Sequence, residues 1–280
     1  MKSLIAELFK LLFKIPFAQR VYYRAYKSIF TPSKIFKGVK KRVKLKDGII
    51  YELIISDWVQ GNLYFVGKYE AAEIKFVKDN VTNGNVFIDI GANIGLYSLT
   101  ASQSVKKSGK VIAFEPFLNN YKLFKNNIAF NGFTNIIVEN QAISDSNKQI
   151  TLFYNTKDDN LGMASSYLSE YTHSEMINAI SLDQYVADHK IAAVDFVKID
   201  IEGGEYIALI GMKNILSNCN PILLIEMDEG ILSSTPYRKE DIIGYLNGFG
   251  YEMFYIDDHG KLSSIEVNKN RKNYIFIKKQ

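Results

Sequence analysis

The 280-residue chain is expected to adopt an α/β fold, with a mostly parallel sheet covered by helices on both faces. From residue 86 onward, short apolar segments alternate with stretches of helical spacing, as in parallel strands joined by helices. Hydrophobic residues make up 47% of the chain, enough for a substantial core. Near the end, two apolar segments lie on either side of a His259-Gly260 turn. An antiparallel pair should therefore complete the sheet.

Seven segments are expected to form this sheet. The strands are predicted at 86–90, 110–114, 136–140, 196–201, 221–227, 251–257 and 273–278. The helices are predicted at 69–80, 94–106, 117–131, 204–217 and 237–249. Residues 149–155 form a further extended piece, and the polar stretch 155–175 is expected to be a loop.

Residues 1–60 are predicted to form a basic extension, and residues 61–280 the main domain. Residues 1–46 carry thirteen Lys/Arg and one acid, so this arm has a charge of +12 and the remainder −8. A first helix with a wide apolar face is expected to end at Pro16, followed by a second helical segment and a hairpin turning at Asp47-Gly48.

Two alternatives account for the apolar face of this arm. It could pack on the protein's own core or on a partner, or residues 1–30 could lie in the interface of an anionic membrane. No apolar run there reaches the ~18–20 residues of a spanning helix. A lone cysteine, Cys219, favours a reducing, cytoplasmic location, at the inner face of the membrane under the second alternative. The sequence leaves the oligomeric state open.

The segment 86–98 combines a buried strand, an acid and two glycines four residues apart. Gly91 and Gly95 permit a sharp turn and a close approach of a ligand to the backbone. Such turns lie at the edge where open α/β sheets bind ligands. A dinucleotide-binding turn would have a glycine where Asn93 stands, and Asp89 would repel a pyrophosphate but suits a cationic amino group.

Two further strands end in residues that suit a nucleoside. Glu115, followed by Pro116, ends the second strand, where a carboxylate can accept both hydroxyls of a ribose. After the third strand, Asn140 or the backbone near Ala142 could contact an adenine edge, although Asn140 could instead cap the turn. These residues indicate a nucleoside ligand without specifying which one.

The fourth strand ends in two acids, Asp200 and Glu202, which strand alternation places on the same side of the chain. Two close carboxylates can act as a general base or position a hydroxyl. With Glu226 at the tip of the next strand they could bind a divalent cation, although no metal is predicted. The alternative is that acids are favoured here by the dipole of the following helix.

Four ordered motifs over roughly residues 69–227 resemble those of the FkbM family of S-adenosylmethionine-dependent methyltransferases. They are Asp-x-Gly-Ala-Asn-x-Gly, Phe-Glu-Pro, Asn-x-Ala-x-Ser and Lys-Ile-Asp-x-Glu-Gly-x-Glu. The resemblance implies a class I methyltransferase fold, Rossmann-like with a mixed seven-stranded sheet. It also implies O-methylation of a hydroxyl on a sugar, glycan or glycan-like natural product.

By this resemblance, the methionine end of the cofactor is held around the glycine turn, the ribose by Glu115, and the methyl group lies near Asp200 and Glu202. Tyr69-Glu70 resembles a family element upstream of the turn. The residues expected to bind the cofactor are Glu70, Asp89, Gly91, Ala92, Asn93, Gly95, Leu96, Glu115, Pro116, Asn140 and Ala142.

The sequence leaves the acceptor unidentified. Ser165, Ser166 and His173 in the polar stretch, together with Glu226, are candidates for contact with a hydroxylated acceptor. His173 is also an alternative general base.

Three other functions compete with methyl transfer to a glycan. A nucleic-acid methyltransferase could use the +12 arm to bind phosphates. Enzymes that methylate base amino groups usually have Asn/Asp-Pro-Pro-aromatic at the fourth strand, and this chain contains no Pro-Pro, so nucleic acid is not the expected partner. A non-catalytic binding module would be expected to have lost some of these residues. The glycine turn disfavours a nicotinamide oxidoreductase.

Overall fold

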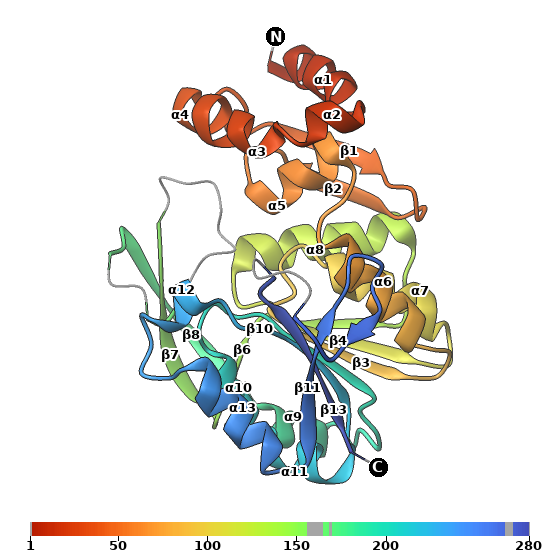
Figure 1. The fold of residues 1–280 in the computed structure, drawn as a ribbon, viewed down its shortest axis with the longest axis vertical. Helices are drawn as coiled ribbons and strands as arrows, with labels where there is room; N and C mark the ends of the chain where they lie inside the picture. Colours follow the sequence, from red (N-terminus) through yellow and green to blue (C-terminus); the bar gives the residue numbers. More distant parts are fainter. Residues whose placement is uncertain (1, 156–164, 168–169, 267–270, 280) are drawn as a thin grey trace.

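The computed structural model describes residues 2–155, 165–167, 170–266 and 271–279. Its centre is a mixed sheet with the strand order β12-β11-β13-β10-β9-β3-β4-β5 (Figure 1). In this order the strands are Leu262–Ser263, Tyr251–Ile256, Asn273–Lys278, Ile222–Glu226, Phe196–Ile199, Val86–Ile90, Lys110–Phe114 and Ile136–Glu139. The five strands from β10 to β5 are parallel, and β13 and β11 are antiparallel additions. The predicted seven-stranded mixed sheet is confirmed, with the two-residue β12 as an extra edge strand.

Helices cover both faces of this sheet (Figure 1). On one face lie α6 (Ala71–Asn80), α7 (Leu96–Val105) and α8 (Leu118–Asn131). On the other lie α9 (Leu182–Asp188), α10 (Glu205–Ile210), α11 (Lys213–Asn218) and α13 (Lys239–Asn247). Successive residues of β3 point to opposite faces, since Phe87 packs with α6 and α7 while Ile88 packs with α9 and α10. This burial on both faces explains why the strands are almost wholly apolar.

The helix predicted over 204–217 is in fact two helices, α10 and α11, separated at Gly211. A Cβ on Gly211 would lie 2.0 Å from the carbonyl oxygen of Ser144, so the chain passes here in direct contact with another strand. That contact depends on tertiary packing, which the helical spacing does not reveal.

A second sheet of three strands, in the order β6-β8-β7, lies beside the first. Its strands are β6 (Ala142–Ser144), β7 (Lys148–Tyr154) and β8 (His173–Ser181). The extended piece expected at 149–155 is thus β7. The sequence analysis missed β8, which starts inside the expected loop, because its first four residues are exposed and show no apolar alternation. The other residues of that loop lie partly outside the described residues.

The N-terminal elements form a layer at one end of the molecule, beyond α8, while the C-terminus lies at the opposite end (Figure 1). Phe13, Phe30 and Phe65 pack in one core with Leu99 of α7 and Phe124 of α8. The elements are α1 (Lys2–Leu12), α2 (Pro16–Gln19), α3 (Tyr22–Ala25), the π-helical segment η1 (Tyr26–Phe30), α4 (Thr31–Ser33), β1 (Lys40–Lys44), β2 (Ile50–Ile54), α5 (Trp58–Gly61) and the π-helical segment η2 (Asn62–Val66).

The hairpin predicted around Asp47-Gly48 is present as β1 and β2, with Gly48 at φ +87°. The second helical segment of the arm begins with α2, is interrupted at residues 20–21 and continues through α3, η1 and α4. Pro16 begins α2 rather than ending α1. Among the described residues, no helix has both the length and the hydropathy needed to cross a bilayer. The division of the chain at residue 60 stays a prediction.

Candidate active site

A cavity of about 920 Å³ lies at the carboxyl ends of β3, β4, β9 and β10, within the size range of small-molecule sites. Acidic side chains outnumber lysines by seven to three along its walls. The predicted site residues that line it are Glu70, Gly91, Ala92, Asn93, Leu96, Glu115, Pro116, Ala142, Ser166, Asp200, Glu202 and Glu226. The walls do not include the other five predicted residues, namely Asp89, Gly95, Asn140, Ser165 and His173.

The glycine turn after β3 forms one wall of the cavity and packs tightly against its neighbours. Gly91 and Gly95 have φ values of +80° and +90°. A Cβ on Gly91 would lie 1.9 Å from the carbonyl oxygen of Asp200, and one on Gly95 would lie 2.1 Å from the ring of Phe124. Both positions therefore need glycine for conformation and for packing. Asn93, between them, also has a left-handed backbone, at φ +51°.

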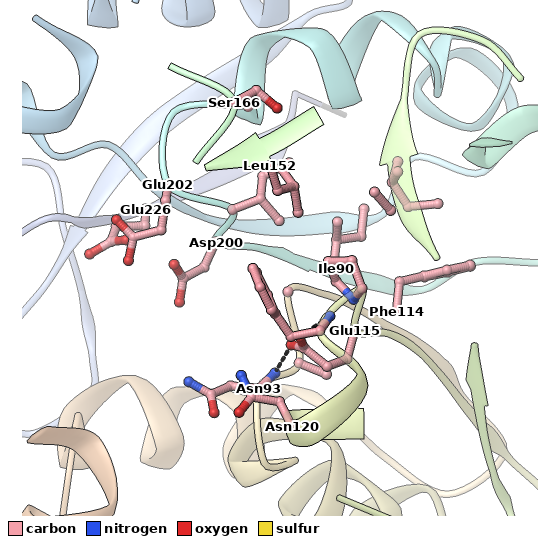
Figure 2. A pocket seen from close by; sticks show the side chains of 18 of the residues that line it. Ile90, Asn93, Phe114, Glu115, Asn120, Leu152, Ser166, Asp200, Glu202 and Glu226 are labelled. Carbon is pink, nitrogen blue, oxygen red and sulfur yellow. Dashed lines mark hydrogen bonds between the residues drawn. The ribbon is translucent and has the colours of Figure 1, made fainter. Parts of the chain in front are cut away.

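Glu115, at the end of β4, holds this turn in place. Its buried carboxylate accepts hydrogen bonds from the backbone N–H groups of Asn93, at 2.7 Å, and Phe117, at 2.9 Å (Figure 2). Burial raises the pKa of Glu115 to about 8, against the lowering effect of these two bonds. A carboxylate offers about four acceptor positions, so Glu115 retains capacity for a ligand hydroxyl.

Asp89 lies behind the cavity wall and contacts the protein itself. Its fully buried carboxylate accepts a hydrogen bond from Ser98 Oγ at 2.6 Å, and its Oδ1 lies 3.6 Å from Lys198 Nζ. Burial raises the pKa of Asp89 above its ordinary value. Its predicted contact with a ligand amino group stays a prediction.

Lys198, on β9, is a site residue to which the sequence analysis assigned no role. Its buried ammonium lies 3.1 Å from Asp200 Oδ2 and donates a hydrogen bond to the carbonyl oxygen of Gly91 at 3.0 Å. Burial disfavours the charged lysine, but the carboxylates of Asp200 and Asp89 outweigh this and raise the pKa of Lys198. The signal in the sequence was a lysine two residues before the strand-end acid, in a strand otherwise apolar.

Asp200, Glu202 and Glu226 bring three carboxyl groups together at the other side of the cavity. Their oxygens lie within 4.8 Å of one another, close enough to share a divalent cation. In the view of Figure 2, Glu202 and Glu226 lie together, and Asp200 lies between them and the Asn93–Glu115 pair. Glu202 has φ +53°, an uncommon backbone conformation for a residue with a side chain.

The three acids differ in how readily they ionise. Burial alone would raise the pKa of Asp200, but the Lys198 ammonium and a hydrogen bond from Glu226 hold it below its ordinary value. Burial, together with the charge of Asp200, raises the pKa of Glu202 to about 8. The same causes raise the pKa of Glu226 well above its usual range. The site therefore combines one ionised carboxylate with two carboxyl groups that hold protons.

Two further glutamates support these walls. Glu70, at φ +44°, accepts hydrogen bonds from Tyr97 Oη at 2.7 Å and Asn273 Nδ2 at 3.0 Å, and burial raises its pKa to about 7. Glu205, which the sequence analysis did not select, accepts bonds from the N–H groups of Ile201 and Gly203 at 3.0 and 3.2 Å. It thereby fixes the backbone on both sides of Glu202.

The remaining predicted residues support the walls or lie away from them. Asn140 donates its amide N–H groups to the carbonyl oxygens of Glu115 and Pro116, at 2.9 and 2.8 Å, which is the turn-capping alternative. Ser165 Oγ donates to the carbonyl oxygen of Glu202 at 2.6 Å. His173 is exposed and stacks on Tyr154.

The parallel sheet with its antiparallel β13–β11 end, together with a glycine turn after β3 and acids after β4 and β9, defines a class I methyltransferase fold. Residues 89–253, more than half of the chain, match the methyltransferase FkbM domain. The chain belongs to the FkbM family of S-adenosylmethionine-dependent methyltransferases.

Several solved structures are similar to the chain. The FkbM methyltransferase of Methylobacillus flagellatus KT has 16% identity and a TM-score of 0.48, covering 77% of this chain and 52% of that one. An rRNA methylase from Streptococcus thermophilus has 11% identity and a TM-score of 0.44, covering 74% and 94%. An S-adenosylmethionine-dependent methyltransferase from Aquifex aeolicus has 16% identity and a TM-score of 0.41, covering 74% and 88%. The chain thus spans about half the length of the FkbM structure, and no curated protein matches it.

Proposed function

We propose that the protein transfers a methyl group from S-adenosylmethionine to a hydroxyl of a sugar, a glycan or a glycan-like natural product. The observation that carries the proposal is that Asp200 and Glu202 line the same cavity as residues 91–94 of the glycine turn. One cavity thus joins a turn suited to a nucleoside with a pair of acids able to orient and deprotonate a hydroxyl.

The residues of the cavity fit this cofactor. Glu115 keeps free acceptor positions for ribose hydroxyls, and the turn around Asn93 brings backbone polar groups to the wall. Asp200, which stays ionised, suits the positive charge of a sulfonium and of an α-amino group. When bound, the cofactor supplies an electrophilic methyl group.

The two acids that follow β9 are suited to different roles. Asp200 stays ionised beside Lys198, so it can accept a hydrogen bond from the acceptor and hold it in line. Since burial and Asp200 raise the pKa of Glu202 to about 8, Glu202 is matched to removing a proton near that pH. We assign Glu202 as the general base and Asp200 as the group that orients the hydroxyl.

The acids of the cavity favour a hydroxylated acceptor. Asp200, Glu202, Glu226 and Asp228 all line the cavity, and their carboxyl groups can accept hydrogen bonds from several hydroxyls. Ser166 lines the same cavity and offers a hydroxyl to a polyol. These features support a glycan-like substrate.

Mass spectrometry can test the acceptor class directly. Glycans, metabolites and RNA would be compared between cells that lack the gene and the same cells complemented with it or with the Glu202→Gln variant. We expect an O-methyl ether on a glycan or glycan-like compound that only the unaltered gene restores. A methyl group restored on RNA, with glycans unchanged, would refute the proposal.

A further inference from the structure

The N-terminal layer exposes many more large hydrophobic side chains than any other part of the described chain. Of sixteen exposed large hydrophobic residues, nine lie between Leu4 and Ile29, while the other seven are scattered from residue 118 to residue 265. We define the docking surface by its most continuous part, Leu4, Leu8, Leu11, Leu12, Ile15 and Phe17. Exposure reaches 68% at Leu4 and 75% at Phe17, and contiguous apolar patches of this kind mark interaction sites.

The two sides of α1 show that this exposure is not a packing defect. At about 100° per residue, Ala6, Phe9 and Phe13 fall on one side of the helix. All three join the core under the N-terminal layer, where Phe9 lies 4.9 Å from Phe30 between ring centroids. Leu4, Leu8 and Leu11 fall on the opposite side, where the described chain offers them no cover. The helix is therefore already anchored and presents a second apolar face outward.

Exposed basic side chains lie close to this apolar face in the sequence. Lys14, Arg20, Arg24 and Lys27 are all exposed in the same short stretch. The only acid of residues 1–46 is Glu7, and it is neutralised locally by Lys41 at 2.6 Å and by a hydrogen bond from Tyr64 Oη at 2.7 Å. The surface thus combines apolar burial with unopposed positive charge, the two features that hold a protein on an anionic membrane.

This charge also decides between a membrane and a second copy of the chain. A symmetric dimer through this face would bring two identical sets of lysines and arginines together, since such an interface is self-complementary. Like charges would then oppose the association. An anionic lipid surface accepts the same apolar side chains and attracts the same basic residues.

We propose that the docking surface binds the protein peripherally to an anionic lipid bilayer. The layer that bears it also forms part of the candidate active site, because Trp58 lines the cavity and stacks on Tyr22 with 5.7 Å between ring centroids. Docking would therefore hold the cavity close to the membrane. The proposal does not depend on the identity of the methyl acceptor.

Vesicle co-sedimentation of the full chain tests this proposal. Vesicles of neutral phosphatidylcholine would carry increasing fractions of anionic phosphatidylglycerol, over a series of salt concentrations. We expect the bound fraction to rise with the anionic lipid and to fall with salt. Leu8→Glu with Phe17→Glu should weaken binding about tenfold or more, whereas Met176→Glu, at an exposed position of β8, should leave it unchanged.

Two charge-reversal variants measure the electrostatic contribution to membrane binding. Lys14→Glu with Arg20→Glu should abolish the dependence on anionic lipid, while Lys107→Glu with Lys122→Glu, at exposed positions elsewhere, should retain it. All of these positions are exposed, so unaltered thermal unfolding is the expected control for the fold. Absence of binding to anionic vesicles, or equal binding to neutral ones, would overturn the proposal. So would a dimer, seen by light scattering, that Leu8→Glu with Phe17→Glu converts to monomer.

Discussion

Lys198 connects three parts of the candidate active site through one buried charge. Its ammonium contacts Asp200 just after its own strand, Asp89 on β3 and the carbonyl oxygen of Gly91 in the glycine turn. Lys198→Met would leave Asp89 buried without its cation. We expect the free energy of unfolding to fall by about 3–5 kcal/mol, measured by urea denaturation, with Lys122→Met as the surface control. A loss below about 1 kcal/mol, typical of an exposed pair, would contradict this account.

Glu202 permits a prediction about the rate and its pH dependence. Because burial and Asp200 raise the pKa of Glu202 to about 8, transfer by the unaltered enzyme should accelerate as the pH rises through that value. Glu202→Gln should lower turnover about 10²- to 10⁴-fold, abolish this rise, and leave affinity for S-adenosylmethionine almost unchanged, with Glu229→Gln as the control. If EDTA abolishes activity and Mg²⁺ restores it, the acids serve as metal ligands and the base assignment is wrong.

The sequence predicts the strand-end acids of the site better than the residues that hold the cavity walls in place. Asp200 and Glu202 both line the cavity, as the edge rule for parallel sheets predicts. The strand alternation used to place them does not apply, because β9 ends at Ile199 and Glu202 has a left-handed backbone. Lys198 was not found because its partner Gly91 lies 107 residues earlier in the chain. For Asn140, spacing alone could not separate ligand contact from turn capping, and its bonds to Glu115 and Pro116 depend on how two loops meet.

At the scale of elements, the glycine turn between β3 and α7 is tied to the end of β9. In Gly91→Ala the added Cβ would lie 1.9 Å from the carbonyl oxygen of Asp200. Because this is a steric clash, the turn would have to move away from β9. We expect a loss of about 2–5 kcal/mol in unfolding free energy from backbone strain and overpacking, together with weaker cofactor binding. Gly132→Ala is the matched control, with φ +65° and no atom within 4 Å of the added Cβ.

Urea denaturation and cofactor titration of both alanine variants separate the cost of a positive φ from the cost of the clash with Asp200. The Gly132 variant should lose only about 1–2 kcal/mol and bind the cofactor normally. Equal losses in the two variants would mean that the contact with β9 has no energetic importance.

Elements with strong periodicity were predicted well and polar or irregular ones poorly. The buried strands β3, β4 and β10 are almost wholly apolar, so their positions followed from composition and spacing. β8 was missed because its exposed first half is polar. The segment around 17–30, predicted to be helical, is interrupted only at residues 20–21, between α2 and α3, and is π-helical over η1. π-Helical turns are rare, so helical spacing alone does not predict one.

At the scale of the whole molecule, the buried acids make stability depend on pH. Burial raises the pKa of Glu70 and Glu205 to about 7, and that of Glu115 to about 8. The folded protein therefore binds more protons than the unfolded chain between pH 4.5 and 8, so unfolding free energy should fall as the pH rises through this range. Urea denaturation at several pH values measures the slope, and Glu115→Gln should reduce it. Stability that rises from pH 5 to 8 would contradict these protonation states.

Isothermal titration calorimetry with S-adenosylmethionine tests the central claim most directly. The account predicts one site per chain, with binding weakened by about 1–3 kcal/mol in both variants: Glu115→Ala removes an acceptor for ribose hydroxyls, and Asp89→Ala removes a partner of the buried Lys198 behind the glycine turn. Glu229→Ala, at an exposed position, should bind as the unaltered chain does, and thermal unfolding of each variant would show that the fold is retained. Failure of the folded, unaltered chain to bind S-adenosylmethionine, or unchanged affinity in both the Asp89 and Glu115 variants, would contradict the assignment of this cavity as the cofactor site.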